Sequence, residues 1–151
     1  MKDRVQEYAS ILRQQATSVL AGYPALKHTW SDQGAIVTLG FPPTDDSGFE
    51  VALQIGNGYA YVLVGHSHYS YNLRSAAPET EIGRALNLVC EVLSTKMRVR
   101  EFRSNDKPYR WLVERQLDGQ WKPELEEEEI FFNYFGRRSE RVYHNKQLAA
   151  S

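Results

Sequence analysis

The pattern of hydrophobic and polar positions divides this chain into two successive blocks, each with a helical period followed by short strand-like runs. The first block covers residues 3–71 and contains an Asn57-Gly58 pair. The second covers about residues 78–135 and contains an Asp118-Gly119 pair. Both dipeptides tolerate positive φ and favour tight two-residue hairpin turns between apolar runs. The pattern therefore predicts an α+β fold.

Two segments carry apolar side chains three or four residues apart, the spacing that places them on one face of a helix. Asp3 can cap the first helix, and Gly22 with Pro24 ends it. Pro78 opens the second helix, where Glu79 and Glu81 complement the helix dipole. The apolar faces consist of Val5, Tyr8, Ala9, Leu12, Ala16, Val19 and Leu20 in the first helix, and Ile82, Ala85, Leu86, Val89, Val92 and Leu93 in the second.

The first hairpin has a register that its apolar positions specify. Residues 35–41 predict a strand that ends at Pro42-Pro43, because proline cannot donate to a sheet ladder. A two-residue turn at Asn57-Gly58 pairs Ile55 with Ala60, Leu53 with Val62, and Val51 with Val64. All six side chains are apolar and share one face, which Phe49 extends. We therefore expect this hairpin to carry the core.

The second hairpin is less clearly divided between a buried and an exposed face. A two-residue turn at Asp118-Gly119 places Leu112 opposite Leu125, and Gln116 opposite Trp121, on one face. The other face then carries Tyr109, Trp111 and Val113 opposite Glu128, Glu126 and Glu124. We expect the Leu112 face to be the core, because burying three carboxylates without partners is costly. Pro123 marks its strand as an edge or bulged strand.

The remaining segments complete the expected fold. Residues 130–135 predict a last strand that is apolar on both sides and therefore central or covered, and residues near 145–151 predict a mobile tail. No linker divides the chain, so residues 1–151 are expected to form one α+β domain, with a twisted antiparallel sheet and two helices packed on one face. The repeated order of elements also suggests a duplicated α-β-β-β unit.

Composition narrows the class of protein further. Hydrophobic residues make up 42% of the 151 residues and charged residues 25%, which is ordinary for a globular protein. The formal net charge of −1 gives no overall attraction to nucleic acid or an anionic membrane. The single cysteine, Cys90, cannot form an internal disulfide and fits a reducing compartment. We find no secretory signal or apolar run long enough to span a bilayer, and therefore expect a cytoplasmic protein.

Charge is distributed in blocks along the second half of the chain. Residues 98–115 are mainly basic, residues 116–130 mainly acidic, and the chain is basic again from residue 137. One interpretation is compensation between paired strands, with Arg110 opposite Glu127, because opposite charges across a strand pair contribute about 0.2–1 kcal/mol each. The other is a row of carboxylates about 6.6–6.8 Å apart that binds a basic partner protein. Tyr109 and Trp111 would then be aromatic anchors beside Glu124, Glu126 and Glu128.

Other functions depend on other residues. Phe102, Tyr109 and Trp111 in the basic segment could stack on nucleic-acid bases, although the neighbouring glutamates argue against it. His66 and His68 have the spacing at which two strand side chains point toward one metal, but no third ligand is evident. Phosphate-binding glycine loops, Cys-x-x-Cys, Gly-x-Ser-x-Gly and His-Glu-x-x-His are absent.

We therefore interpret the chain as a non-enzymatic, cytoplasmic protein-binding module without a cofactor, similar in size to inhibitor or immunity-type proteins. The expected partner has a basic surface, and the expected partner-binding residues are Tyr109, Trp111, Glu124, Glu126 and Glu128. We assign no catalytic or metal-binding residue. The alternative is a small metal-dependent hydrolase or nuclease that uses His66 and His68, and a third class is a small-ligand binder with a site between sheet and helices.

Overall fold

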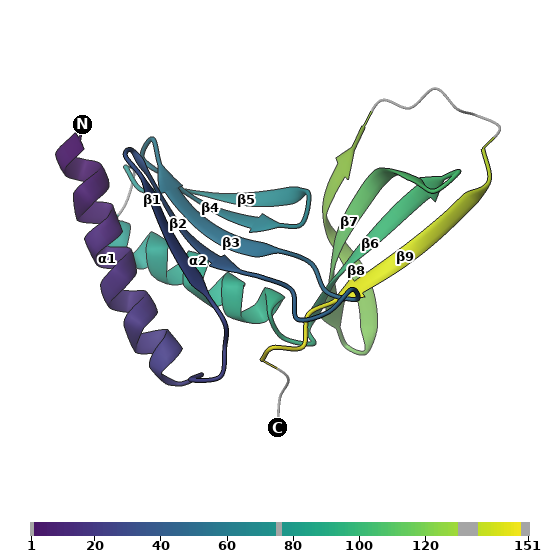
Figure 1. Ribbon diagram of the computed structural model, residues 1–151, viewed down its shortest axis with the longest axis horizontal. Coiled ribbons are helices and arrows are strands. Elements are labelled where there is room, and N and C mark those ends of the chain that lie inside the picture. Colours follow the sequence, from purple (N-terminus) through teal and green to yellow (C-terminus); the bar gives the residue numbers. More distant parts are fainter. Residues whose placement is uncertain (1, 75–76, 130–135, 149–151) are drawn as a thin grey trace.

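The computed structural model describes residues 2–74, 77–129 and 136–148, which form two helices and two antiparallel sheets (Figure 1). The helices are α1 (Lys2–Ala21) and α2 (Pro78–Val92). Sheet A consists of β1 (Thr29–Gln33), β2 (Ile36–Phe41), β3 (Val51–Gly56), β4 (Tyr59–Val64) and β5 (Ser67–Asn72). Sheet B consists of β6 (Met97–Ser104), β7 (Lys107–Leu117), β8 (Gln120–Glu128) and β9 (Arg138–His144).

Sheet A is a meander in which each strand pairs with the next, and both helices pack on one of its faces (Figure 1). Helix α1 starts at Lys2, so Asp3 lies within its first turn and does not precede it as a cap. Helix α2 starts at Pro78 with Glu79 and Glu81 in the first turn, as predicted. The predicted apolar face of α2 is buried throughout, because it packs against the apolar side of the sheet.

The predicted register of the first hairpin is confirmed. Ile55 pairs with Ala60, Leu53 with Val62, and Val51 with Val64, and all six side chains are buried. Asn57 and Gly58 have φ of 53° and 76°, the positive values that a two-residue hairpin turn requires. No helix of the described part of the chain packs on the opposite face of sheet A, which carries partly exposed side chains such as Gln54 and Tyr61.

The prediction of a single sheet is wrong, because strands β6 to β9 form a second sheet with the order β8-β7-β6-β9. Alternation along a strand specifies its two faces, but it does not specify the neighbouring strand. Strand β9 was not predicted, since Arg138–His144 is mostly polar, and it pairs with β6 at the edge of sheet B. The strand predicted over residues 130–135 lies outside the described residues. Among the described residues the first half contains five strands and the second four, an arrangement that differs from a duplicated α-β-β-β unit.

The turn of the second hairpin is confirmed, but its register is only partly so. Gln116 pairs with Trp121 as predicted. A bulge follows at Pro123, where Glu124 is the extra residue, and beyond it Leu125 pairs with Val113 and not with Leu112. The prediction that Pro123 marks an edge or bulged strand holds on both counts, because β8 is also an edge strand of sheet B.

One hydrophobic core extends from the helices through sheet A to one face of sheet B. We call this the junction face of sheet B; its core side chains are Met97, Val99, Trp111 and Val113. The C-terminal segment adds further contacts between the sheets, because the Asn145 side chain bonds both the backbone N and O of Phe49 at 3.1 Å. The backbone N of Leu148 bonds the Leu93 carbonyl at 3.1 Å. Mobility of the tail stays a prediction, and residues 149–151 are outside the described chain.

Candidate functional site

Trp111, the predicted surface anchor, is buried where the two sheets meet. Its side chain is 3% exposed, and its Nε1 donates to Oε1 of Glu101 at 3.1 Å. The imidazole of His66, in the turn between β4 and β5, stacks on the indole with ring centroids 4.1 Å apart. The predicted outward orientation of Trp111 is therefore wrong. The reason is tertiary: the junction face packs toward sheet A, while the helices, which we expected to cover the Leu112 face, pack on sheet A.

The Glu101 carboxylate beside Trp111 is buried, but it has hydrogen-bond and ion-pair partners. Its Oε2 accepts a hydrogen bond from the Tyr143 hydroxyl at 3.0 Å and lies 3.0 Å from Nε of Arg103. A buried carboxylate is tolerated when it has such partners. These groups border a cavity of about 300 Å³ between the sheets, lined in part by Phe49, His66, Val99, Glu101, Trp111 and Tyr143. The arrangement connects β6, β7 and β9 with the loops of sheet A.

The predicted row of three carboxylates is divided by the bulge in β8. Glu126 lies opposite Leu112, on the outer face of sheet B, and forms an ion pair with Arg110 at 2.6 Å. Glu128 lies opposite Arg110. Glu124, at the bulge, instead forms an ion pair with Arg115 at 3.0 Å. Compensation between paired strands therefore exists, although Arg110 does not lie opposite Glu127 as predicted, because the bulge shifts the register by one residue.

Glu124 belongs to a polar cluster that connects the sheets to α2. It accepts a hydrogen bond from the Tyr69 hydroxyl at 2.5 Å, and Arg115 also forms an ion pair with Glu91 of α2. Burial raises the pKa of the Tyr69 hydroxyl well above its ordinary value, and the bond to Glu124 raises it further. Burial would also raise the pKa of the Glu124 carboxyl, but the hydrogen bonds from Arg115 and Tyr69 outweigh it and lower that pKa. Glu124 thus holds two sheets together and is not free for a partner.

Tyr109 lies at a second irregularity, between the pairs Arg103–Pro108 and Phe102–Arg110. It is partly exposed, and the Arg138 guanidinium lies 5.0 Å from its ring centroid. The Tyr109 carbonyl accepts a hydrogen bond from the backbone N of Glu129 at 2.9 Å. Tyr109 is therefore next to the end of β8, as predicted, but it is not beside the buried Trp111 on a shared outward face.

The acidic side chains of β8 that are exposed and have no ion-pair partner among the described residues are at the end of the strand. Glu127, Glu128 and Glu129 are exposed, and none forms an ion pair with another described residue. Because the N–H of Glu129 points to Tyr109, alternation directs the N–H groups of Glu126 and Glu128 to the other side of β8, where no described strand pairs with it; we call this side the open edge of β8. Glu127 and Glu129 were not predicted from the sequence, because only the face of the strand that carries Glu124, Glu126 and Glu128 was chosen as the binding face. The uninterrupted run of glutamates from Glu126 to Glu129 could have indicated them.

His66 and His68 have different ring partners. His66 stacks on Trp111, whereas His68 meets the edge of Tyr61 on the uncovered face of sheet A, with centroids 5.9 Å apart. Among residues 2–74, 77–129 and 136–148, no group of three or more His, Cys, Asp or Glu side chains is arranged to hold a metal ion. No helix in the described part of the chain is long and apolar enough to cross a membrane.

Comparison of this chain with protein-family models, with curated proteins and with solved structures gives no match.

Proposed function

We propose that this protein is a non-enzymatic, cytoplasmic protein-binding module, of inhibitor or immunity type, whose partner presents a basic surface to the open edge of β8. The observation that carries the proposal is the end of β8, where three consecutive glutamates are exposed on an edge strand. Exposed backbone groups on an edge can bind an added strand, and carboxylates beside them favour a basic one. The proposal moves the partner-binding surface from Trp111 to Glu127, Glu128, Glu129 and the adjacent Tyr109.

The arrangement of charge in β8 supports this location. Glu124 and Glu126 are used within the protein, by Arg115 and Arg110. The proline and the bulge, two features that protect an edge strand from unwanted pairing, occur at Pro123 and Glu124. The segment Glu126–Glu129 has neither feature and keeps its outward N–H groups. Charged side chains also protect edge strands from unwanted pairing without binding any partner. The test therefore measures binding of a partner protein and not the exposure of the glutamates.

The test begins with chemical cross-linking in the native host and identification of the cross-linked partner by mass spectrometry. Association is then measured with the purified partner for a variant carrying Glu127→Gln, Glu128→Gln and Glu129→Gln. We expect slower association and a flatter dependence on salt, because charge at an interface rim mainly accelerates encounter. The control variant carries Glu7→Gln, Asp32→Asn and Glu79→Gln, three exposed acids elsewhere, and changes the net charge equally.

A second pair of variants separates strand addition from simple charge attraction. Glu128→Pro removes a backbone N–H on the open side, whereas Glu128→Gln removes only the charge. We expect Glu128→Pro to accelerate dissociation more than Glu128→Gln does. Equal loss of association in the Glu127–Glu129 variant and in the matched control would reject the proposed surface, and a partner with an acidic contact surface would reject the proposed chemistry.

A further inference from the structure

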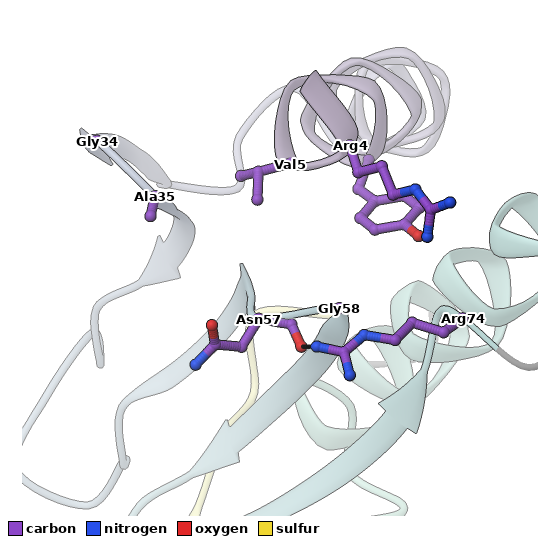
Figure 2. Close-up of a pocket in the computed structure, with 8 residues that line it drawn as sticks. Arg4, Val5, Gly34, Ala35, Asn57, Gly58 and Arg74 are labelled. Atoms are coloured by element: carbon purple, nitrogen blue, oxygen red, sulfur yellow. Dashed lines mark hydrogen bonds between the residues drawn. The ribbon is translucent and has the colours of Figure 1, made fainter. Parts of the chain in front are cut away.

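A cavity of about 460 Å³ lies where the start of α1 approaches two turns of sheet A (Figure 2). This volume is in the range of roughly 300–1,000 Å³ that small-molecule sites occupy. Helix α1, the β1–β2 turn and the β3–β4 turn each contribute residues to the lining of the cavity. Arg74, which follows β5, completes it. The lining residues are Arg4, Val5, Tyr8, Gly34, Ala35, Asn57, Gly58 and Arg74.

Arg74 is held in a defined position at this cavity. Its Nη2 donates to the carbonyl of Asn57, as Figure 2 shows, and its guanidinium lies 5.6 Å from the centroid of the Tyr59 ring. Gly58 makes this possible, because a Cβ at that position would collide with the guanidinium. These contacts orient Arg74 without neutralising it: no carboxylate among the described residues forms an ion pair with it.

The opposite wall carries a second cation and a hydroxyl. Arg4 projects from α1 and, within the described part of the chain, has no carboxylate partner (Figure 2). Tyr8 is 6% exposed, and its hydroxyl forms no hydrogen bond with any described residue. The hydroxyl oxygen is not among the buried polar atoms that lack a partner, so it keeps some solvent exposure and is accessible from the cavity that Tyr8 lines. Val5 and Ala35 give the same cavity apolar surface.

We propose that this cavity binds a small organic monoanion with an apolar body, such as a medium-chain carboxylate. Arg74 and Arg4 bind the carboxylate, since a guanidinium matches its geometry and charge. The Tyr8 hydroxyl donates to the same group, and the apolar chain lies against Val5 and Ala35. Inorganic phosphate would use the arginines but leave this apolar surface without a partner. The cavity shares no residue with the open edge of β8, so the two proposals can fail separately.

The experiment is a titration of the full chain with octanoate, followed by ¹H–¹⁵N NMR, with 1-octanol and inorganic phosphate as comparison probes. Octanoate should shift the amide signals of Gly34 and Gly58 saturably and bind at least about tenfold more tightly than either probe. Arg4→Gln and Arg74→Gln should each weaken octanoate binding about tenfold or more, the loss expected for one charge-assisted hydrogen bond. Tyr8→Phe should weaken it less.

Arg13→Gln is the matched control, because Arg13 lies on the same helix but packs on Trp30, outside the cavity. It should leave octanoate affinity unchanged, while Ala35→Trp should abolish binding by filling the cavity. Circular dichroism of each variant tests folding, and if Arg74→Gln disturbs the Asn57 turn, Arg4→Gln carries the test. Absence of saturable binding, equal affinity for 1-octanol, or equal weakening by Arg13→Gln would overturn the proposal.

Discussion

The indole of Trp111 and the carboxylate of Glu101 form a buried hydrogen bond at the junction of the two sheets, with 3.1 Å between Nε1 and Oε1. The bond connects neighbouring strands, since Glu101 on β6 pairs with Trp111 on β7. The His66 ring, which stacks on the indole, comes from the turn between β4 and β5 of sheet A. A residue that the sequence favoured as a surface anchor therefore contributes to the contact between the sheets, and its replacement should first affect stability.

Replacement of Trp111 by alanine should cost about 3–5 kcal/mol in the free energy of unfolding, because it leaves a cavity in the core. Trp111→Phe should cost about 1–3 kcal/mol, since it keeps an aromatic ring but removes the donor to Glu101. Leu112→Ala is the comparison, because Leu112 is 8% exposed and lies outside the main core cluster. Urea titration should show a smaller loss for Leu112→Ala than for Trp111→Ala; the reverse order would contradict the burial of the Trp111 face.

Leu53 tests the core of sheet A. Its side chain is fully buried between the sheet and the helices, so Leu53→Ala should lower the free energy of unfolding by about 2–5 kcal/mol. Gln54, the next residue, points to the uncovered face, where its amide bonds the Thr38 hydroxyl at 3.3 Å. Gln54→Ala should cost much less. Denaturant titrations giving equal losses for the two variants would reject the register of this hairpin.

Asn145 connects the C-terminal segment to sheet A through both polar atoms of its amide. Asn145→Ala leaves the buried N–H and carbonyl of Phe49 without these partners, at a cost of about 1–3 kcal/mol each. Hydrogen exchange should become faster at Phe49 and along β9, and the melting temperature should fall. Asn87→Ala, at an exposed position on α2, is the control. Unchanged exchange at Phe49 in Asn145→Ala would show that the segment is held by other contacts.

We expect His144 to make the free energy of unfolding depend on pH. Burial, assisted by the nearby charges of Arg98 and Lys146, lowers the pKa of its imidazole below the ordinary value of 6.5. The unfolded chain then binds more protons than the folded one just below pH 6.5, so its contribution to stability is present above that pH and is lost as pH falls through the lower folded pKa. Urea unfolding between pH 5 and 8 should show this loss.

His144→Gln should reduce the slope of stability against pH in this range. The imidazole of His144 also meets the Trp121 ring edge-on at 5.9 Å, so the absolute stability of His144→Gln can change; only the pH slope tests the titration. A slope as steep in His144→Gln as in the wild type would assign the dependence to other groups.

Turn residues and local periodicity were sufficient to predict some of this fold. Four features depend on residues that are near one another in sequence. They are the start of α2 at Pro78, the buried face of α2, the Asn57-Gly58 turn and the pairing of Leu53 with Val62. Such features depend on helix caps, positive φ and side-chain alternation, which the residues themselves specify. The candidate site was predicted less well: Tyr109 and the acidic strand are near the open edge, but Trp111 is not.

By itself, the sequence determined an α+β protein, the start of α2, both hairpin turns and the bulged, edge-forming nature of the strand with Pro123. Only the tertiary structure decided that the strands divide into two sheets, that Trp111 faces inward, and that Glu124 bonds Tyr69 across the junction. The physical reason is that alternation creates two faces in every strand without ranking them. Which face is buried depends on what packs against it, and for sheet B that is another sheet, distant in the chain.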